Sequence, residues 1–202
     1  IEHEATLNNM LKESQLQVLR TQINPHFLFN SLNSLNSLIA SKPDKAGEML
    51  IELSDYMRYS INSINEQFTP LQSELNQIER YVSIEKIRFG KRLSFDIDVC
   101  EKCPQIQVPA MILQPLVENA IKHGLYGDLE GVKIILKINI QNQFLLINIS
   151  NNFNSEQTSP KGTGLGLRNI QDRLLKLFGS KDLIHITKEN SIFNVQIRIP
   201  IK

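Results

Sequence analysis

The sequence predicts an α+β protein in which an N-terminal helical hairpin is followed by a two-layer α/β sandwich. Three observations support this prediction. Apolar residues recur at helical spacing through the first part of the chain. From residue 93 onward, apolar and polar residues alternate in several short stretches, as in half-buried strands. Helical stretches lie between these strands, and strands in one layer with interspersed helices are typical of a two-layer sandwich.

Length and composition set the limits for function. The chain has 202 residues, enough for one large domain or two modest ones with a buried core. A net charge of +1 gives no indication of a nucleic-acid or anionic-membrane surface, so we expect no direct nucleic-acid partner. No run approaches the roughly 18 apolar residues of a membrane span, and no signal peptide is present. Because the chain starts at Ile1, we expect a fragment whose membrane-spanning segments would lie outside it.

The first helix is expected to start just before His26. Pro25 lacks an amide donor and disfavours helical backbone at Asn24, so a kink or a helix start is predicted there. Apolar side chains at four-three-four spacing predict the packing face of this helix. This face consists of Leu28, Leu32, Leu35 and Ile39. A separate polar face consists of His26, Asn30, Asn33 and Ser37.

A second helix follows the turn at residues 41–44, where Asp44 is the candidate N-cap. Its predicted packing stripe consists of Ala46, Leu50, Leu53, Met57, Ser60 and Ile64. Two helices joined by a short turn form an antiparallel hairpin, which has too little core to stand alone. Pairing with a second copy into a four-helix bundle would bury the remaining apolar face. We therefore assign residues 1–66 to a dimerisation hairpin.

The second predicted domain, residues 67–202, alternates helices with strands. It begins with a helix over about residues 71–89, after Pro70, and a strand over 93–99. The other expected elements are a helix at about 110–123, strands at 132–140 and 144–150, a helix at about 165–178, and strands at 183–188 and 192–199.

The two cysteines, Cys100 and Cys103, form a single C-x-x-C motif. Such a motif can be half of a zinc site or a redox pair. Because the chain contains no second pair, we expect two reduced thiols at a turn.

His26 is the candidate phosphoryl acceptor. Its imidazole is the one nearby side chain that accepts a phosphoryl group well near neutral pH, since Ser31 and Ser34 are poorer nucleophiles without a base. Asn30, one helical turn later, is placed to orient the ring. A lone histidine is more often structural than catalytic, so this assignment depends on the motifs that follow it.

Polar side chains in the helix at 110–123 form a candidate metal and phosphate site. Asn119 can give one of the one or two protein oxygens that Mg²⁺ needs when it binds phosphates. Lys122 and His123 lie within reach of the same ligand, and Glu118 could polarise the attacking imidazole or organise the metal. Taken alone, the pattern also fits an amphipathic helix with a solvated polar face.

A glycine motif comes directly before the helix at 165–178. Glycines let the backbone approach phosphates, and the start of a helix offers unpaired amides. The amides concerned are those of Gly162, Thr163, Gly164, Leu165 and Gly166. The motif fits neither a Walker loop nor a dinucleotide fingerprint, and a loop that only permits tight packing is the alternative.

Together these motifs resemble the sensor histidine kinases of the LytS/YehU type over about residues 15–200. The resemblance rests on five blocks of sequence. These are Gln22–Asn33 with its Asn-Pro-His, Leu53–Ser60, Tyr81–Leu93, Leu113–Gly124 with its Glu-Asn, and Gly162–Leu174.

The resemblance implies a dimer of hairpins carrying His26, followed by an ATP-binding domain of the Bergerat (GHKL) type with Mg²⁺ on Asn119. It also implies transfer of the phosphoryl group to an aspartate of a response regulator, often one with a LytTR DNA-binding domain. Members of the family lie at the cytoplasmic end of a membrane-spanning sensor. We expect the connection at about residues 64–70 to act as a hinge between the domains.

One position departs from the family pattern. Many such domains have Asp-x-Gly-x-Gly after the strand that ends here at Ser150, and the Asp binds the adenine amino group. This chain has Asn151 in the place of the Asp and lacks the glycines. A neutral Asn oxygen still accepts a hydrogen bond, but charged acceptors contribute about twice as much. Residues 153–161 would form a short ATP lid.

Two other functions are compatible with parts of the pattern. A dimeric signalling scaffold that has lost kinase activity would explain the altered box at Asn151. A GHKL ATPase that drives conformational change would explain the nucleotide motifs. Such an ATPase has no need for a hairpin with Asn-Pro-His, and the presence of His26, Asn119 and the glycine motif argues against the scaffold.

Overall fold

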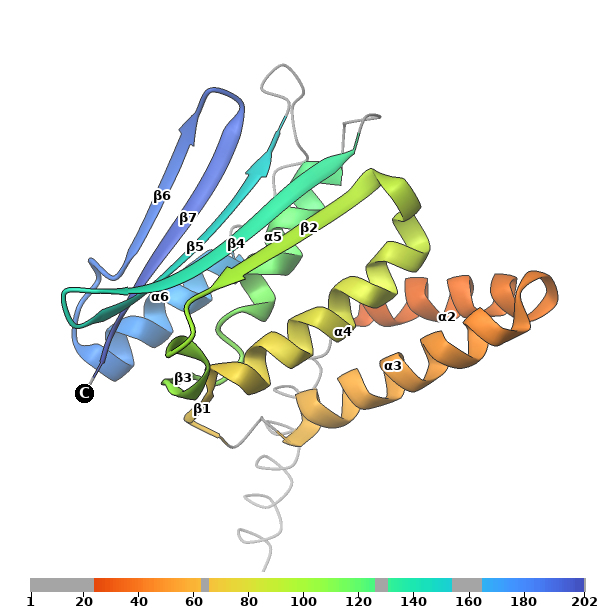
Figure 1. The fold of residues 1–202 in the computed structure, drawn as a ribbon, viewed down its shortest axis with the longest axis horizontal. Helices are drawn as coiled ribbons and strands as arrows, with labels where there is room; N and C mark the ends of the chain where they lie inside the picture. Colours follow the sequence, from red (N-terminus) through yellow and green to blue (C-terminus); the bar gives the residue numbers. More distant parts are fainter. Residues whose placement is uncertain (1–23, 63–65, 126–130, 154–164, 202) are drawn as a thin grey trace, which may run out of the picture. The chain divides into compact units, whose positions relative to one another are not determined.

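The structure is a computed structural model that describes residues 24–62, 66–125, 131–153 and 165–201. The chain divides into two compact units, residues 1–66 and residues 67–202, each with its own internal contacts (Figure 1). None of the described helices is long and apolar enough to cross a membrane.

The first unit is a hairpin of two helices, α2 (Pro25–Ser41) and α3 (Pro43–Asn62), joined by Lys42. Helix α2 starts where the proline predicts it. The side chain of Asn24 caps the helix by accepting a hydrogen bond of 3.2 Å from the amide of Phe27. Pro25 occupies the first turn, where its missing amide costs nothing.

The packing face of α2 differs from the predicted leucine stripe. The buried residues of this helix are Phe27 and Ser31, and the Phe27 ring lies 5.1 Å from that of Tyr56 on α3. Leu32 and Ile39 are instead 45% and 59% exposed. The buried face therefore lies one residue, or about 100°, away from the predicted one. Periodicity shows that an apolar stripe exists, but it does not show which partner covers it.

Helix α3 follows the predicted packing face in part. Its buried residues are Ala46, Met49, Leu53, Tyr56 and Ser60. Ala46, Leu53 and Ser60 were predicted, whereas Met49 and Tyr56 take the places of their predicted neighbours, Leu50 and Met57. Leu50 is exposed, and Ile64 lies outside the described residues. Asp44 is not the N-cap, because the helix already begins at Pro43 and Asp44 lies inside its first turn.

The second unit is the predicted two-layer sandwich. One layer is a five-stranded sheet in the order β2-β4-β5-β7-β6, with β2 parallel to β4 and the other pairs antiparallel. Its strands are β2 (Leu93–Val99), β4 (Val132–Gln141), β5 (Phe144–Asn152), β6 (Ile184–Glu189) and β7 (Ile192–Pro200). The other layer contains α4 (Leu71–Phe89), α5 (Gln114–Leu125) and α6 (Leu165–Phe178), which cover one face of the sheet (Figure 1).

Alternate residues of the central strands form the core between these layers. Along β5 every second residue from Leu145 to Asn151 is buried, and the intervening residues are partly exposed. The same period of two appears in β4 and β7. Asn142 and Gln143 join β4 to β5 with positive φ angles of 49° and 64°, as a tight hairpin turn requires.

Two short strands were not predicted. β1 (Phe68–Pro70) pairs antiparallel with β3 (Gln107–Pro109) in a separate two-stranded sheet. Three residues are too few for a detectable alternation, and each strand ends in a proline, which argues against a strand in sequence analysis.

The prediction of two reduced thiols is wrong in this structure. Cys100 and Cys103 form a disulfide with a Cα–Cα distance of 5.3 Å. The amide of Cys103 donates to the carbonyl oxygen of Cys100 at 3.0 Å, and this turn brings the two side chains together. Cys103 is fully buried. Sequence spacing alone does not show whether a turn closes in this way.

Candidate functional site

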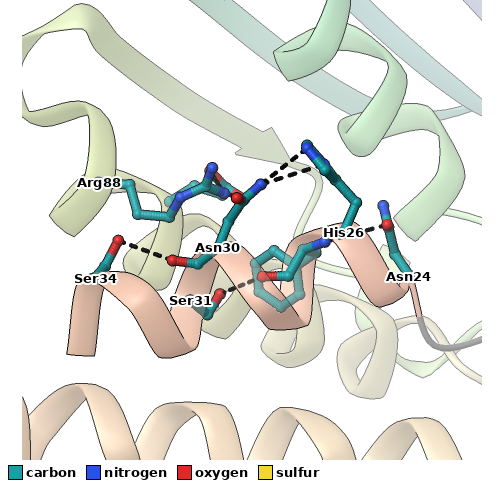
Figure 2. A network of polar contacts seen from close by, with 8 residues as sticks. Asn24, His26, Asn30, Ser31, Ser34 and Arg88 are labelled. Atoms are coloured by element: carbon teal, nitrogen blue, oxygen red, sulfur yellow. Dashed lines mark hydrogen bonds and ion pairs between the residues drawn. The ribbon is translucent and has the colours of Figure 1, made fainter. Parts of the chain in front are cut away.

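His26 lies in the first turn of α2, and its imidazole is exposed. The amide nitrogen of Asn30 lies 3.1 Å from Nε2 and 3.3 Å from Nδ1 of the ring (Figure 2). A neutral imidazole has one acceptor nitrogen, so the amide donates to one ring nitrogen at a time. The predicted pairing of His26 with Asn30 one turn later is therefore present.

The two serines beside His26 are engaged by the helix itself. Ser31 Oγ donates to the carbonyl oxygen of Phe27 at 2.8 Å, and Ser34 Oγ donates to that of Asn30 at 3.0 Å (Figure 2). Ser31 is also fully buried. A hydroxyl whose proton is bonded to a backbone carbonyl, with no base beside it, is a poor nucleophile. His26 is thus the better acceptor in this turn of the helix.

Helix α5 carries the predicted metal and phosphate residues. Its apolar residues Leu116, Val117, Ala120 and Ile121 are buried. Glu118, Asn119 and His123 are half-buried, and Lys122 is exposed. Gln114 Nε2 donates to Glu118 Oε1 at 2.8 Å and so fixes that carboxylate. The helix therefore holds its polar residues on a rigid support that has one face in the core.

The imidazole of His123 is neutral near physiological pH. Burial lowers its pKa below the ordinary value of 6.5, and the positive charges of Lys122 and Lys188 lower the pKa further. A neutral His123 can donate one hydrogen bond to an anion. The positive charge of this end of α5 then comes from Lys122.

Sequence analysis did not single out a buried carboxylate on α4, Glu85. Its side chain is 3% exposed and is paired with Arg88, whose guanidinium lies 2.6 Å from Oε1. Burial raises the pKa of Glu85 from 4.5 to about 7, although the Arg88 charge and hydrogen bond lower it. The charge of Glu118 on α5 adds to the rise, so the two carboxylates interact. In the sequence, the one indication of this buried pair is a Glu and an Arg three positions apart. Such pairs are common on exposed helix faces, so the spacing does not predict burial.

Asn151 lies near the end of β5, on the face of the sheet that the helices cover, and is 2% exposed. Its Nδ2 donates to the backbone oxygen of Asn152 at 2.9 Å. This bond uses the amide nitrogen, so the side-chain carbonyl oxygen remains as an acceptor.

Gly124 brings the end of α5 against Asn151 and β4. A Cβ at Gly124 would lie 3.5 Å from Asn151 Nδ2 and closer to the Val132 side chain than non-bonded atoms can approach. Only glycine allows this close approach. The structure therefore brings Asn151 and the end of α5 together.

The glycine motif is described only in part. Gly162, Thr163 and Gly164 lie outside the described residues, as does the predicted lid from residue 154 onward. Leu165 and Gly166 are the first two residues of α6. Among the described residues outside this turn of the helix, no atom lies within 4 Å of a Cβ built on Gly166.

Glu74 on α4 is a second buried carboxylate that sequence analysis missed. It accepts hydrogen bonds from the amides of Met111 at 2.6 Å and Leu113 at 3.1 Å, just before α5. These bonds, together with a φ of 57° at Met111, explain why α5 begins at Gln114 and not at the predicted Ala110. A glutamate in the first turn of a helix gave no reason to expect this contact.

The described residues contain no group of three His, Cys, Asp or Glu side chains that could hold a metal ion by themselves. A Mg²⁺ ion bound mainly through phosphates needs only one or two protein oxygens. The half-buried carboxamide of Asn119 on a rigid helix fits that need. The donor set therefore suits metal that arrives with a nucleotide.

Comparison with known proteins identifies the class. The family model for histidine kinases matches residues 14–93. The fold is similar to that of the histidine kinase AdeS from Acinetobacter baumannii, with a TM-score of 0.51 and a sequence identity of 14%. The match covers 87% of this chain and 95% of the AdeS chain. At this identity the likeness concerns the fold alone. The fold, the Asn-Pro-His helix and the family model together define a histidine kinase core.

The sequence relatives make the class more specific. The sensor protein LytS from Oceanobacillus iheyensis is 34% identical over 212 residues, and the match covers 97% of this chain. The sensor histidine kinase BtsS from Escherichia coli is 34% identical over 192 residues, 95% of this chain. The chain belongs to the LytS-type sensor histidine kinases. It spans only 36% and 34% of the lengths of these two relatives.

Proposed function

We propose that this chain is the kinase core of a two-component sensor, which phosphorylates itself on His26 with ATP and passes the phosphoryl group to an aspartate of a response regulator. The observation that carries the proposal is the exposed imidazole of His26 with the Asn30 amide on its ring. In a LytS-type histidine kinase, this is a nucleophile that is both accessible and oriented.

The nucleotide would bind to the second unit. Asn151 would accept a hydrogen bond from the adenine amino group through its carbonyl oxygen. Lys122 and His123 would contact the phosphates, together with the amides of residues 162–166 at the start of α6. Asn119 would be a ligand of Mg²⁺, which neutralises phosphate charge when it is bound.

The transfer step uses few protein groups. The unprotonated ring nitrogen of His26 forms a bond to the γ-phosphorus, while the bond to the bridging oxygen breaks and its electron pair leaves with ADP. Asn30 would hold the ring, and Glu118 would polarise the imidazole as it develops positive charge. Positioning and charge neutralisation supply most of the rate enhancement in such reactions.

The proposed hinge between the units would not include all of residues 64–70. Residues Phe68–Pro70 pair with Gln107–Pro109, so this part of the connection belongs to the second unit. A hinge at residues 64–70 is thereby confined to the residues before Phe68.

The proposed partners are a second copy of the chain and a receiver domain. The hairpin exposes large apolar side chains, and Phe29 and Ile51 are 67% and 65% exposed. Others on the same two helices are Leu32, Ile39, Leu50 and Ile61. Apolar surface of this kind marks an interface, and a four-helix bundle of two hairpins would bury it. A regulator of the LytTR type and a place on the cytoplasmic side of a plasma-membrane sensor follow from the family resemblance.

The scaffold remains the alternative function, because Asn151 replaces the usual Asp. One relative is named a sensor histidine kinase, and the chain keeps His26 and Asn119, which favours an active enzyme. A chaperone-like ATPase would have no use for the oriented imidazole of His26.

Incubation with γ-labelled ATP and Mg²⁺ tests the proposal. We expect acid-labile label on the wild type and on His185→Gln, a matched control in which an exposed histidine of β6 is replaced. We expect none on His26→Gln. Label that persists on His26→Gln would show that the acceptor lies elsewhere. Absence of label together with absence of nucleotide binding would favour the scaffold.

A further inference from the structure

We infer that Glu74 is a positioning residue of the nucleotide site: its buried carboxylate holds the turn from which α5 starts, and so holds the proposed metal and phosphate contacts of that helix. This inference rests on the proposed function and names a group that acts on the nucleotide through other residues. Glu74 lies in the first turn of α4 and is 2% exposed.

The Glu74 carboxylate binds two backbone amides that are distant from it in the sequence. One oxygen accepts a hydrogen bond from the amide of Met111 at 2.6 Å, and the other accepts one from the amide of Leu113 at 3.1 Å. Met111 lies 37 positions after Glu74, and Leu113 lies 39 positions after it. A carboxylate with both oxygens on backbone amides makes strong, charge-assisted hydrogen bonds and fixes the segment that donates them.

That segment needs an external support. Met111 has a φ of 57°, in the left-handed region that a side chain other than glycine rarely adopts. Backbone of this kind persists only where its surroundings hold it. The Glu74 carboxylate bonds the amide of this same residue, so it is the group that stabilises the turn.

The turn sets the position of α5. The carbonyl oxygen of Leu113 accepts hydrogen bonds from the amides of Leu116 and Val117, so the helix continues directly from the residue that Glu74 holds. A displacement of Leu113 would move the whole of α5 as a rigid body. Asn119 and Lys122, the proposed metal and phosphate contacts, would move with it.

A role in folding alone would predict a different outcome from a role in positioning. If Glu74 only stabilised the domain, Glu74→Gln would lower the melting temperature, but the folded fraction would bind Mg²⁺ and ATP normally. If Glu74 positions α5, the folded variant would need more Mg²⁺ and more ATP, because Asn119 and Lys122 are displaced.

The experiment measures KM for ATP, kcat for His26 labelling and the Mg²⁺ concentration for half-maximal nucleotide binding. All are measured on the whole chain, at a temperature where circular dichroism shows each variant to be folded. Glu74→Gln is expected to raise KM and the Mg²⁺ requirement by about 10-fold, in the range found when groups that support metal ligands are removed. Glu74→Asp, which keeps the charge, is expected to recover part of the loss. Glu79→Gln, an exposed glutamate of the same helix, is expected to match the wild type.

If Glu74→Gln does not fold, Glu74→Asp is the test, because its shorter side chain keeps the charge but cannot hold both amides as Glu74 does. It is expected to raise KM for ATP and the Mg²⁺ requirement above the wild-type values. Folded Glu74→Gln with wild-type KM and Mg²⁺ requirement would overturn the inference, as would wild-type values in Glu74→Asp. If the wild type itself neither binds ATP nor becomes labelled, the proposed function fails, and the inference fails with it.

Discussion

At the scale of single residues, the surroundings of each side chain decide its chemistry. His26 is exposed and bonded to the Asn30 amide, whereas Glu85 is buried beside Arg88 and near the charge of Glu118. The first arrangement leaves the imidazole accessible, as the proposed phosphoryl transfer to His26 would need. The second keeps a carboxyl group protonated at a pH where an exposed one would be charged.

Replacement of Asn30 by Ala tests the orientation of the imidazole. We expect labelling of His26 to slow by about 10- to 100-fold, because the ring loses the amide that holds it. Nucleotide affinity should not change, since the proposed binding residues lie in the second unit. Labelling rates and ATP titrations of Asn30→Ala measure the two effects.

Asn33→Ala is the matched control for this prediction, because Asn33 is an exposed amide of the same helix. It should label at the wild-type rate. Equal rates in the wild type and Asn30→Ala would show that the contact does not contribute to the reaction.

Glu85 predicts a pH dependence of stability. The pKa of Glu85 is about 7 in the folded protein against an ordinary value of 4.5, so the folded state keeps a proton that the unfolded chain loses between these values. The stabilisation is fully present below pH 4.5 and is lost as the pH rises to about 7. The size of this shift corresponds to a loss on the order of 3 kcal/mol.

Glu85→Gln removes the titrating group. We expect the free energy of unfolding of this variant to fall less between about pH 5 and about pH 8 than that of the wild type, as chemical denaturation at each pH would show. Glu79→Gln, on the exposed side of the same helix, should follow the wild type. An equal pH dependence in Glu85→Gln and the wild type would contradict the raised pKa.

At the scale of the elements, two aromatic residues of α2 have opposite surroundings although only one residue separates them. Phe27 is 3% exposed and packs on Tyr56, while Phe29 is 67% exposed. Because successive helical residues differ by about 100°, one ring faces α3 and the other points away from it. The hairpin core and the proposed dimer surface therefore use different residues of one helix.

Phe27→Ala and Phe29→Ala separate these two surfaces. Phe27→Ala should lower the stability of the hairpin by about 3–5 kcal/mol, the usual cost of removing a buried phenylalanine. Phe29→Ala should leave the fold intact and weaken self-association. Thermal unfolding and sedimentation over a range of protein concentrations distinguish the two effects. A dimer of unchanged affinity in Phe29→Ala would exclude this residue from the interface.

At the scale of the whole molecule, the proposed acceptor and the proposed nucleotide site lie in separate compact units. His26 belongs to the unit of residues 1–66, and Glu118, Asn119, Asn151 and Gly166 belong to residues 67–202. The second unit has a complete core between its sheet and three helices. An internal core of this kind is what allows a domain to fold on its own.

The fragment 67–202 is therefore expected to unfold cooperatively and to bind ATP with the affinity of the whole chain. It should not label itself with γ-labelled ATP, because it lacks His26. Added hairpin, residues 1–66, should become labelled at a rate that rises with its concentration. Labelling of the fragment alone would place an acceptor in the second unit.

Several elements could be predicted from the sequence because local rules decide them. The bounds of α4, β2 and α6 agree with prediction, since each combines a clear apolar period with a proline or glycine beside it. The start of α5 could not be predicted, because the bond that delays it comes from Glu74, more than 30 residues earlier. The exposure of Leu32 likewise depends on which face of α2 meets α3.

The class of fold, the order of most elements and the motifs that resemble the LytS-type kinases could be predicted from the sequence. These depend on periodicity, on special backbone residues and on motifs that are continuous along the chain. The contact of Asn151 with Gly124, the bond between Cys100 and Cys103, and the burial of Glu85 and Glu74 among specific partners appear only in the folded structure. Contacts between distant segments and the burial of charge arise only when the chain has folded, because both depend on distances in space.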